Sequence, residues 1–427
     1  MNYSQILDAN KEAMLENLQK LIAIKSVEEA ATPEYPFGKG VADALSFMLL
    51  LADKMGFSAR NMNNYIGYAD FGEGAVEDGF AILVHLDVVP EGNGWDTNPY
   101  EGIIKDGKMY GRGSLDNKGP AMAALYAMYS LKQSGFMPSK RIRLILGCDE
   151  ESGWLDIDHY KKTEKMPRTG ISPDAEYPII NNEKAILHLE ISQTFHDNGL
   201  LIFKSGERAN MVPDFAEAKI GSEILTESGK GAHASTPEKG ENAAVVLLER
   251  VLESSEKGEG LSFAKNIYEK IGHCITGECL GFPKAIAREM TVNIGIVDIV
   301  EKEGKLVLDI RFPEKITKEE VMEKVGALFG MGKTKMQVLH FSAGHFVPES
   351  DILIKTLKSV YEMYMNKEAY CITIGGGTFA RSIEQGVAFG PVRIGEESLI
   401  HGANEYYKIN DMIEDAKMMA EVLYRLT

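Results

Sequence analysis

The segment ILVHLDVVP (82–90) holds two polar residues, His85 and Asp87, inside an apolar run. Side chains two positions apart in a β-strand point to the same face, so an imidazole and a carboxylate would lie together where this strand ends. Such a pair can serve a metal ion, or it can be a hydrogen-bonded structural pair. The positions of the other acidic residues and histidines decide between these two interpretations.

Further carboxylates and a second imidazole lie next to other predicted strands and helices. Asp116 lies in GRGSLDNKGP before a predicted helix, while Glu150 and Glu151 lie in LILGCDEESG after a buried strand. Asp174 lies in the loop GISPDAEYP, and His401 lies in LIHGANEYY ahead of the last predicted helix. Each of them alone is explained by turn or capping chemistry. Together with His85 they form a set that suits Zn²⁺, Mn²⁺ or Co²⁺ and differs from an all-oxygen Ca²⁺ site.

The candidate ligands exceed the need of one ion. A carboxylate that bridges two ions about 3.5–4 Å apart would use them all, and it would leave one position for a bridging water whose pKa the ions lower towards about 7. We therefore expect two divalent metal ions as cofactors, with Zn²⁺ as the first choice and Mn²⁺ or Co²⁺ as alternatives.

The elements that must position these residues are of two kinds. Before about residue 186 and again near the end of the chain, buried strands such as FAILVHL and RIRLILGC alternate with helical patterns over 4–24, 41–57, 117–136 and 409–426. This alternation predicts an α/β fold with a mostly parallel sheet flanked by helices. Between the two parts, strands with period-two alternation and two helical runs (242–256 and 317–329) predict an inserted α+β domain.

Composition and charge narrow the function classes. The chain has 427 residues, which is too long for one ordinary hydrophobic core. Its net charge of −17 would repel phosphate backbones and anionic membranes, so we expect neither nucleic acid nor a membrane as partner. Because the N-terminal segment has acidic residues where a secretory signal would be basic, and no apolar run is long enough to span a membrane, we expect a cytoplasmic protein. In that compartment reduced thiols are expected at all four cysteines, which are Cys148, Cys274, Cys279 and Cys371.

Six motifs along nearly the whole chain resemble those of a known family. In order, they are HLDVVP, GRGSLDNKGP, DEESG, SPDAEYP, GAHASTP and LIHGANEYY, and they resemble the dinuclear zinc exopeptidases that include aminoacylase and carboxypeptidase G. GERANMVPD, DIRFP, GGGTFAR and GVAFGP most closely resemble the dipeptidase V (PepV) and Xaa-His dipeptidase, or carnosinase-like, branch. The resemblance implies a zinc-exopeptidase-like catalytic domain (1–186 and 346–427), a lid domain (187–345), and a dipeptidase that hydrolyses unblocked dipeptides.

The same resemblance implies how the candidate ligands share two ions. His85 and Asp174 would hold one ion, Glu151 and His401 would hold the other, and Asp116 would bridge them. The family also has a cis peptide bond after the residue that corresponds to Asp116.

The resemblance implies roles for further residues as well. Asp87 would orient His85 and fix its tautomer, and Glu150 would be the general base that moves a proton from the bridging water to the leaving amine. His233 would stabilise the oxyanion of the tetrahedral intermediate. Asn210 and Arg311 would contact the substrate backbone and its terminal carboxylate. The residues that could place a tight turn against the same carboxylate are Gly376, Gly377 and Thr378.

Two alternatives to a dipeptidase stay open. An N-acyl amino acid deacylase or related amide hydrolase could use the same scaffold, although ANMVPD and GGGTFAR favour dipeptides. A non-catalytic binding relative would be free to lose a ligand or the base, and this sequence retains them all. The length of the insert leaves both a monomer and a homodimer open.

Overall fold

The chain forms two compact units, each with its own hydrophobic core. The computed structural model describes residues 2–197, 201–254, 257–330, 334–396 and 399–427. The first unit consists of Met1–Asn182, Val347–Ile372 and Thr378–Thr427, and the second consists of Glu183–Phe346 and Thr373–Gly377. Within the described ranges, no helix has the length and apolar character needed to cross a membrane.

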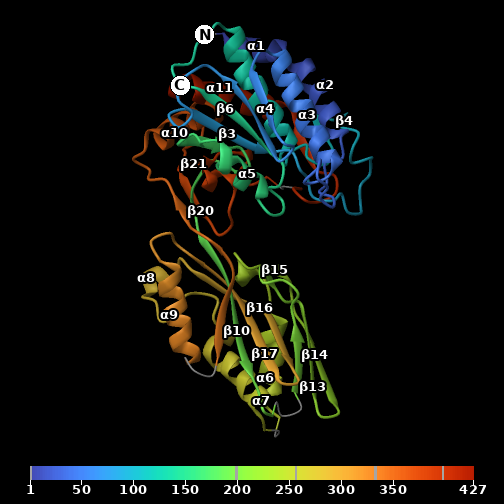
Figure 1. Cartoon of the computed structure of the whole chain (residues 1–427), viewed down its shortest axis with the longest axis vertical. Helices are drawn as coiled ribbons and strands as arrows, with labels where there is room; N and C mark the ends of the chain where they lie inside the picture. Colours follow the sequence, from blue (N-terminus) through green and yellow to red (C-terminus); the bar gives the residue numbers. More distant parts are fainter. Residues whose placement is uncertain (1, 198–200, 255–256, 331–333, 397–398) are drawn as a thin grey trace. The chain divides into compact units, whose positions relative to one another are not determined.

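The first unit alternates helices and strands (Figure 1). Its helices are α1 (Tyr3–Ala9), α2 (Lys11–Ile22), α3 (Lys39–Lys54), α4 (Lys118–Gln133), α5 (Leu155–Thr163), α10 (Ile352–Met365), the 3-10 helix η3 (Phe379–Ser382) and α11 (Ile409–Leu426). Its strands are β1 (Ser58–Met62), β2 (Ile66–Phe71), β3 (Phe80–His85), β4 (Ile103–Lys105), β5 (Lys108–Tyr110), β6 (Ile142–Gly147), β7 (Thr169–Ser172), β8 (Ala175–Glu176), β21 (Gln385–Ala388), β22 (Pro391–Val392) and β23 (Tyr406–Lys408). The segments where the chain passes between the units hold β9 (Ile179–Glu183), β19 (His345–Phe346) and β20 (Cys371–Ile374).

The main sheet of the first unit is mixed. Its strands follow the order β1-β2-β6-β3-β7-β21-β9. β3 pairs in parallel with β6 and β7, and β21 pairs in parallel with β7, whereas β1 with β2, β2 with β6 and β21 with β9 are antiparallel. The predicted α/β class with a helix-flanked sheet is confirmed, and the parallel pairing is confined to the centre of the sheet.

Burial on both faces explains why β3 and β6 are apolar throughout. In β3, Ile82 and Val84 belong to the core that includes α1 to α4, α10 and α11. Leu83 points to the opposite face, where it packs in a smaller cluster with Ile157 of α5 and Phe379 of η3. A strand covered on both sides tolerates polar side chains only where it leaves the core. The candidate ligands therefore come at strand ends.

The second unit is an antiparallel sheet with helices. Its strands are β10 (Ala185–Thr194), β11 (Leu201–Ser205), β12 (Met211–Val212), β13 (Phe215–Ile220), β14 (Glu223–Ser228), β15 (Ala232–His233), β16 (Thr291–Val300), β17 (Glu303–Phe312) and β18 (Lys335–Ser342). Its helices are η1 (Pro237–Lys239), α6 (Ala243–Val251), α7 (Glu259–Ile267), the π-helix η2 (Tyr268–Gly272), α8 (Lys284–Ala287) and α9 (Lys318–Phe329). The main sheet has the order β14-β13-β11-β16-β17-β10-β18, and β10 alternates buried and half-buried residues as its sequence predicts.

Two predicted helices differ from the observed ones. The pattern over 4–24 forms α1 and α2, which meet at Asn10. The Asn10 side chain donates to the carbonyl oxygen of Ile6 at 2.8 Å, and asparagine side chains that bond to the backbone in this way compete with helix continuation. The pattern over 242–256 forms α6, which ends at Val251, and residues 255 and 256 lie outside the described residues.

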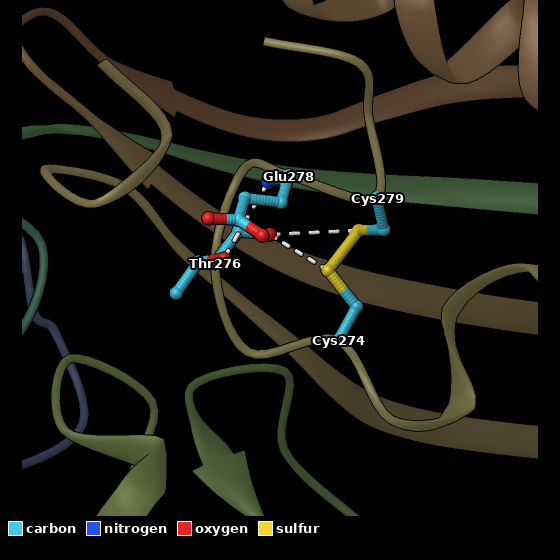
Figure 2. The surroundings of a disulfide bond; sticks show 4 residues. All are labelled: Cys274, Thr276, Glu278 and Cys279. Carbon is cyan, nitrogen blue, oxygen red and sulfur yellow. Dashed lines mark hydrogen bonds between the residues drawn. A yellow bond between two sulfur atoms is a disulfide. The ribbon is translucent and has the colours of Figure 1, made fainter. Parts of the chain in front are cut away.

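The prediction of reduced thiols is wrong for two of the four cysteines. Cys274 and Cys279 are joined by a disulfide bond, which closes a short loop around Thr276 and Glu278 (Figure 2). Two cysteines five positions apart can be bridged only if the backbone between them folds back, and the Cα atoms here are 5.9 Å apart. Cys148, which is buried, and Cys371 are free thiols.

Candidate functional site

Asp116 lies between the two histidines of the predicted set. Its Oδ1 is 2.9 Å from Nε2 of His85, and its Oδ2 is 3.0 Å from Nε2 of His401. Nε2 of His85 is also 3.6 Å from Oδ1 of Asp174, and Nε2 of His401 is 3.0 Å from Oε1 of Glu151. The structure thus brings all five predicted ligands together in two groups that share Asp116, with the ligand atoms of each group within 4.8 Å of one another.

The topology of the sheet explains why these residues meet. His85 is the last residue of β3, Glu151 follows β6, and Asp174 follows β7. These three strands are parallel neighbours, so their carboxyl ends lie at the same edge of the sheet, where open α/β sheets gather ligands. Asp116 reaches this edge from the turn before α4, and His401 reaches it from the segment before β23.

Two further side chains hold these loops. Nδ1 of His85 is 3.0 Å from the backbone oxygen of Asp87, whereas the Asp87 carboxylate is farther away, with Oδ1 at 3.5 Å. The carboxylate instead accepts the backbone N–H of Glu151 at 3.0 Å, which ties the β6 loop to the β3 loop. Asn117, whose role the sequence pattern does not predict, donates to Oδ1 of Asp174 at 3.1 Å and to the backbone oxygen of Pro173 at 2.7 Å. The peptide bond before Asn117 is cis, as the resemblance implies.

The carboxylates among the five candidate ligands favour positive charge between them. Hydrogen bonds with Asp116 and Glu151 raise the pKa of His401 to about 10. Burial alone would lower the pKa of His85, but Asp174 and Asp116 raise it well above its usual value. For the carboxyl group of Asp174, burial has the opposite effect and raises the pKa to about 6. Carboxylates this close to one another are stabilised by bound protons or by cations, and a divalent ion is the stronger counter-charge.

Glu150 lies beside the two groups and belongs to neither. Burial, and then the charge of Asp174, raises the pKa of Glu150 well above the usual range of a carboxyl group. Its backbone oxygen accepts the indole N–H of Trp154 at 2.8 Å, which fixes the turn after β6. A half-buried carboxyl group with a raised pKa, next to possible metal ligands, is suited to accept and then return a proton.

The predicted substrate residues of the second unit are neighbours of one another. β12 pairs with β15 so that Met211 lies opposite His233, and the backbone oxygen of Asn210 accepts the N–H of Ala234 at 2.9 Å. Nδ1 of His233 is 2.7 Å from the hydroxyl oxygen of Ser235.

Arg311 is connected to the same neighbourhood through Gly375. The Nη1 of Arg311 donates to the backbone oxygen of Gly375 at 2.6 Å. A Cβ added at Gly375 would lie 2.7 Å from Cβ of Ser235, so this position requires glycine. Gly376 and Gly377 follow in the second unit, and Thr378 in the first unit caps the N-terminus of η3, where its hydroxyl accepts the N–H of Ala380 at 3.2 Å.

Comparison with known proteins assigns the family. The model of peptidase family M20/M25/M40 matches residues 81–425. The chain belongs to this peptidase family. It is 36% identical to the Beta-Ala-Xaa dipeptidase of Lactobacillus delbrueckii subsp. lactis, over 100% of this chain and 98% of that protein.

Solved structures share the fold. Human carnosine dipeptidase 1 is similar with a TM-score of 0.62 and 16% identity, over 100% of this chain and 98% of the other. The aminoacylhistidine dipeptidase from Vibrio alginolyticus is similar with a TM-score of 0.64 and 13% identity, over 96% of both chains. The predicted family is confirmed, and membership in it makes this M20 chain a peptide-bond hydrolase.

Proposed function

We propose that this protein is a metal-dependent dipeptidase that hydrolyses unblocked dipeptides. The observation that carries the proposal is the Asp116 carboxylate, which has the imidazole of His85 at one oxygen and that of His401 at the other. Two three-residue groups that share one carboxylate match the ligand set of two ions. The names of the relatives, a Beta-Ala-Xaa dipeptidase among them, support dipeptides as the substrate class.

The donor atoms fit two divalent ions of the Zn²⁺ type. His85 and Asp174 would hold one ion, Glu151 and His401 the other, and Asp116 would bridge them. Nitrogen and carboxylate oxygen donors suit Zn²⁺ first, and also Mn²⁺ or Co²⁺. Ions bound there would polarise the scissile carbonyl and would lower the pKa of a coordinated water towards about 7.

The side chains next to the ligands would move the proton and orient the ligands. In the proposal Glu150 takes the proton of the attacking water and gives it to the leaving amine. Its raised pKa suits both steps because the same carboxyl group must first accept and then donate. Asp87 would hold His85 in one tautomer through its backbone oxygen, which is the nearest acceptor to Nδ1.

The remaining predicted residues would bind the substrate. His233 would donate to the oxyanion of the tetrahedral intermediate, and Asn210, its neighbour across β12 and β15, would contact the substrate backbone. Arg311 would bind the free carboxylate of the dipeptide with its planar fork. The turn residues proposed for the same carboxylate are Gly376, Gly377 and Thr378.

The two parts of the chain would have different roles. We assign catalysis to residues 1–186 and 346–427 and a lid role to residues 187–345. We also propose that the protein is cytoplasmic, acts as a monomer or a homodimer, and has no nucleic acid or membrane partner. Support for these points comes from the acidic composition and the resemblance of the motifs.

A substrate panel with metal control tests the proposal. Purified protein is assayed on free dipeptides and on the same dipeptides with N-acetyl groups, before and after chelation, and again after addition of Zn²⁺, Mn²⁺ or Co²⁺. We expect hydrolysis of the free dipeptides, loss of activity after chelation and recovery with metal. Rates that chelation leaves unchanged would refute the metal mechanism, and preference for acetylated substrates would indicate an N-acyl amino acid deacylase.

A further inference from the structure

A buried ion pair lies in the first unit between the segments that carry Asp116 and His401. Nη1 of Arg112 donates to Oε2 of Glu405 at 2.6 Å, and the side chains are 1% and 0% exposed. Asp116 lies four positions after Arg112, and Glu405 lies four positions after His401. Neither residue belongs to one of the groups of possible metal ligands found among the described residues.

The Glu405 carboxylate holds the loop that leads to Asp116. Its Oε1 accepts the backbone N–H groups of Leu115 at 2.8 Å and Asp116 at 3.1 Å. Its Oε2 accepts the N–H of Gly113 at 3.1 Å in addition to the Arg112 guanidinium. A carboxylate offers about four acceptor positions, and here four donors use them. One of these donors is the backbone of the proposed bridging ligand itself.

The Arg112 guanidinium holds two further segments. Its Nη2 donates to the backbone oxygen of His401 at 3.2 Å. The same nitrogen lies 3.4 Å from the oxygen of Pro90 and 3.3 Å from that of Glu91, in the segment that follows β3. A planar fork can reach several acceptors at once, which an ammonium group cannot do in the same geometry.

Strand pairing brings the two residues together. β23 pairs with β5 in an antiparallel ladder, in which Tyr406 lies opposite Tyr110. The ladder continues one step beyond the strands, because the N–H of Gly111 donates to the backbone oxygen of Glu405 at 3.0 Å. The next residues, Arg112 and Gly113, therefore face the Glu405 carboxylate.

We propose that Arg112 and Glu405 are positioning residues for the two-ion centre, which fix the backbones of Asp116 and His401 and so set the ligand geometry. The inference rests on the ligand roles in the proposed function. A pair that served stability alone would not need to bond to the backbones of two candidate ligands from distant segments. Outer groups that orient metal ligands typically change metal affinity by about 10–100-fold when they are removed.

Metal binding by the whole apo-protein, measured without substrate, tests the proposal. Affinities for Zn²⁺ and Co²⁺ are determined by competition with a chromogenic chelator for the wild type and Glu405→Gln, and the visible spectrum of the Co²⁺ form is recorded. The amide nitrogen of glutamine cannot accept a backbone N–H, so part of the clamp is lost. We expect at least one ion to bind about 10–100-fold more weakly, a changed Co²⁺ spectrum, and activity that recovers at higher metal concentration.

Asp70→Asn is the matched control. Asp70 forms a buried ion pair of the same type with Arg143, with Nε to Oδ1 at 2.7 Å and Nη2 to Oδ2 at 2.8 Å. Arg143 lies near the start of β6, whereas Glu151 follows the opposite end of that strand. We expect this control to be less stable than the wild type but to keep the wild-type metal affinities and Co²⁺ spectrum.

A second variant keeps the proposal testable if Glu405→Gln does not fold. Arg112→Lys retains the positive charge next to Glu405 but cannot also reach the backbone oxygen of His401, so it should weaken metal binding too. Wild-type affinities and spectrum in the folded variants, or an effect no larger than that of Asp70→Asn, would overturn the inference. A wild-type protein that binds no metal would instead contradict the proposed function, and this inference with it.

Discussion

The fork of Arg311 allows a sharp test of substrate recognition. Nε and Nη2 of Arg311 bond to the carboxylate of Asp309 at 2.9 and 3.0 Å, and Nη1 bonds to the oxygen of Gly375. A guanidinium has five donors, so these three contacts leave two for the carboxylate of a dipeptide. The change Arg311→Lys keeps a positive charge beside the buried Asp309 but removes the fork.

The size of the effect follows from the lost contact. A single ammonium would replace a bidentate contact, which removes about one hydrogen bond to a charged group, or about 1.5–3 kcal/mol. Because about 1.4 kcal/mol corresponds to a factor of ten, kcat/KM for free dipeptides should fall roughly 10- to 150-fold. The carboxylate takes no part in bond cleavage, so we expect its contact to be similar in the ground state and the transition state. The loss should therefore be found mainly in KM.

The assay compares each dipeptide with its C-terminal amide, which has no carboxylate to bind. We expect Arg311→Lys to reduce the preference of the enzyme for the free dipeptide. The matched control is Arg143→Lys, since Arg143 makes the same Nε and Nη2 contacts with Asp70. It should lose stability and keep the wild-type preference. If Arg311→Lys slowed both substrates equally, Arg311 would act only through the structure around Asp309, and the reasoning would be refuted.

Three further predictions concern the base, the disulfide and a buried acid. Glu150→Gln should lower kcat by about 10²–10⁴-fold while metal analysis still finds the wild-type ion content, and near-wild-type turnover would indicate another base. Replacing Cys274 and Cys279 by serine should lower the free energy of unfolding in denaturant by about 2 kcal/mol, because the disulfide closes only a short loop; activity should not change. Burial raises the pKa of Asp156 from 3.8 to about 7, so the folded state favours its protonated form, and the wild type loses stability as the pH rises through this window. The stability of Asp156→Asn relative to the wild type should therefore increase from pH 4 to pH 7. A stability difference that does not change with pH would contradict the raised pKa of Asp156.

Part of the site could be predicted because three of the candidate ligands are polar residues at the end of an apolar pattern. His85 ends a strand buried on both faces, and Glu151 and Asp174 follow two neighbouring strands of the same kind. Local pattern therefore predicts where these residues lie along their own strands. It does not predict the distances between them, because these depend on the strand order. Here only the resemblance implied which ligands would share an ion.

Other features could not be predicted because they depend on pairing across the fold. Arg112 and Glu405 are 293 positions apart, and in the sequence each is an ordinary charged residue of the kind found on surfaces. The link between Cys274 and Cys279 depends on how the chain between them folds back. Which atom of Asp87 lies nearest to His85 could not be predicted either. It is the backbone oxygen, since β3 ends at His85 and strand alternation no longer applies beyond it.

The charge distribution connects these observations to function. Three carboxylates and two imidazoles meet at one edge of the sheet, although repulsion between the acids opposes their assembly. Without a cation, protons must supply the compensation, which is why the pKa of His401 is raised to about 10. Stability alone would favour apolar residues of similar volume at the buried positions among them, such as those of His85 and Asp116, since buried charges contribute little net stability. This cluster of acids and imidazoles opposes folding and is arranged around one shared carboxylate. It is therefore best explained by the ions that it can bind.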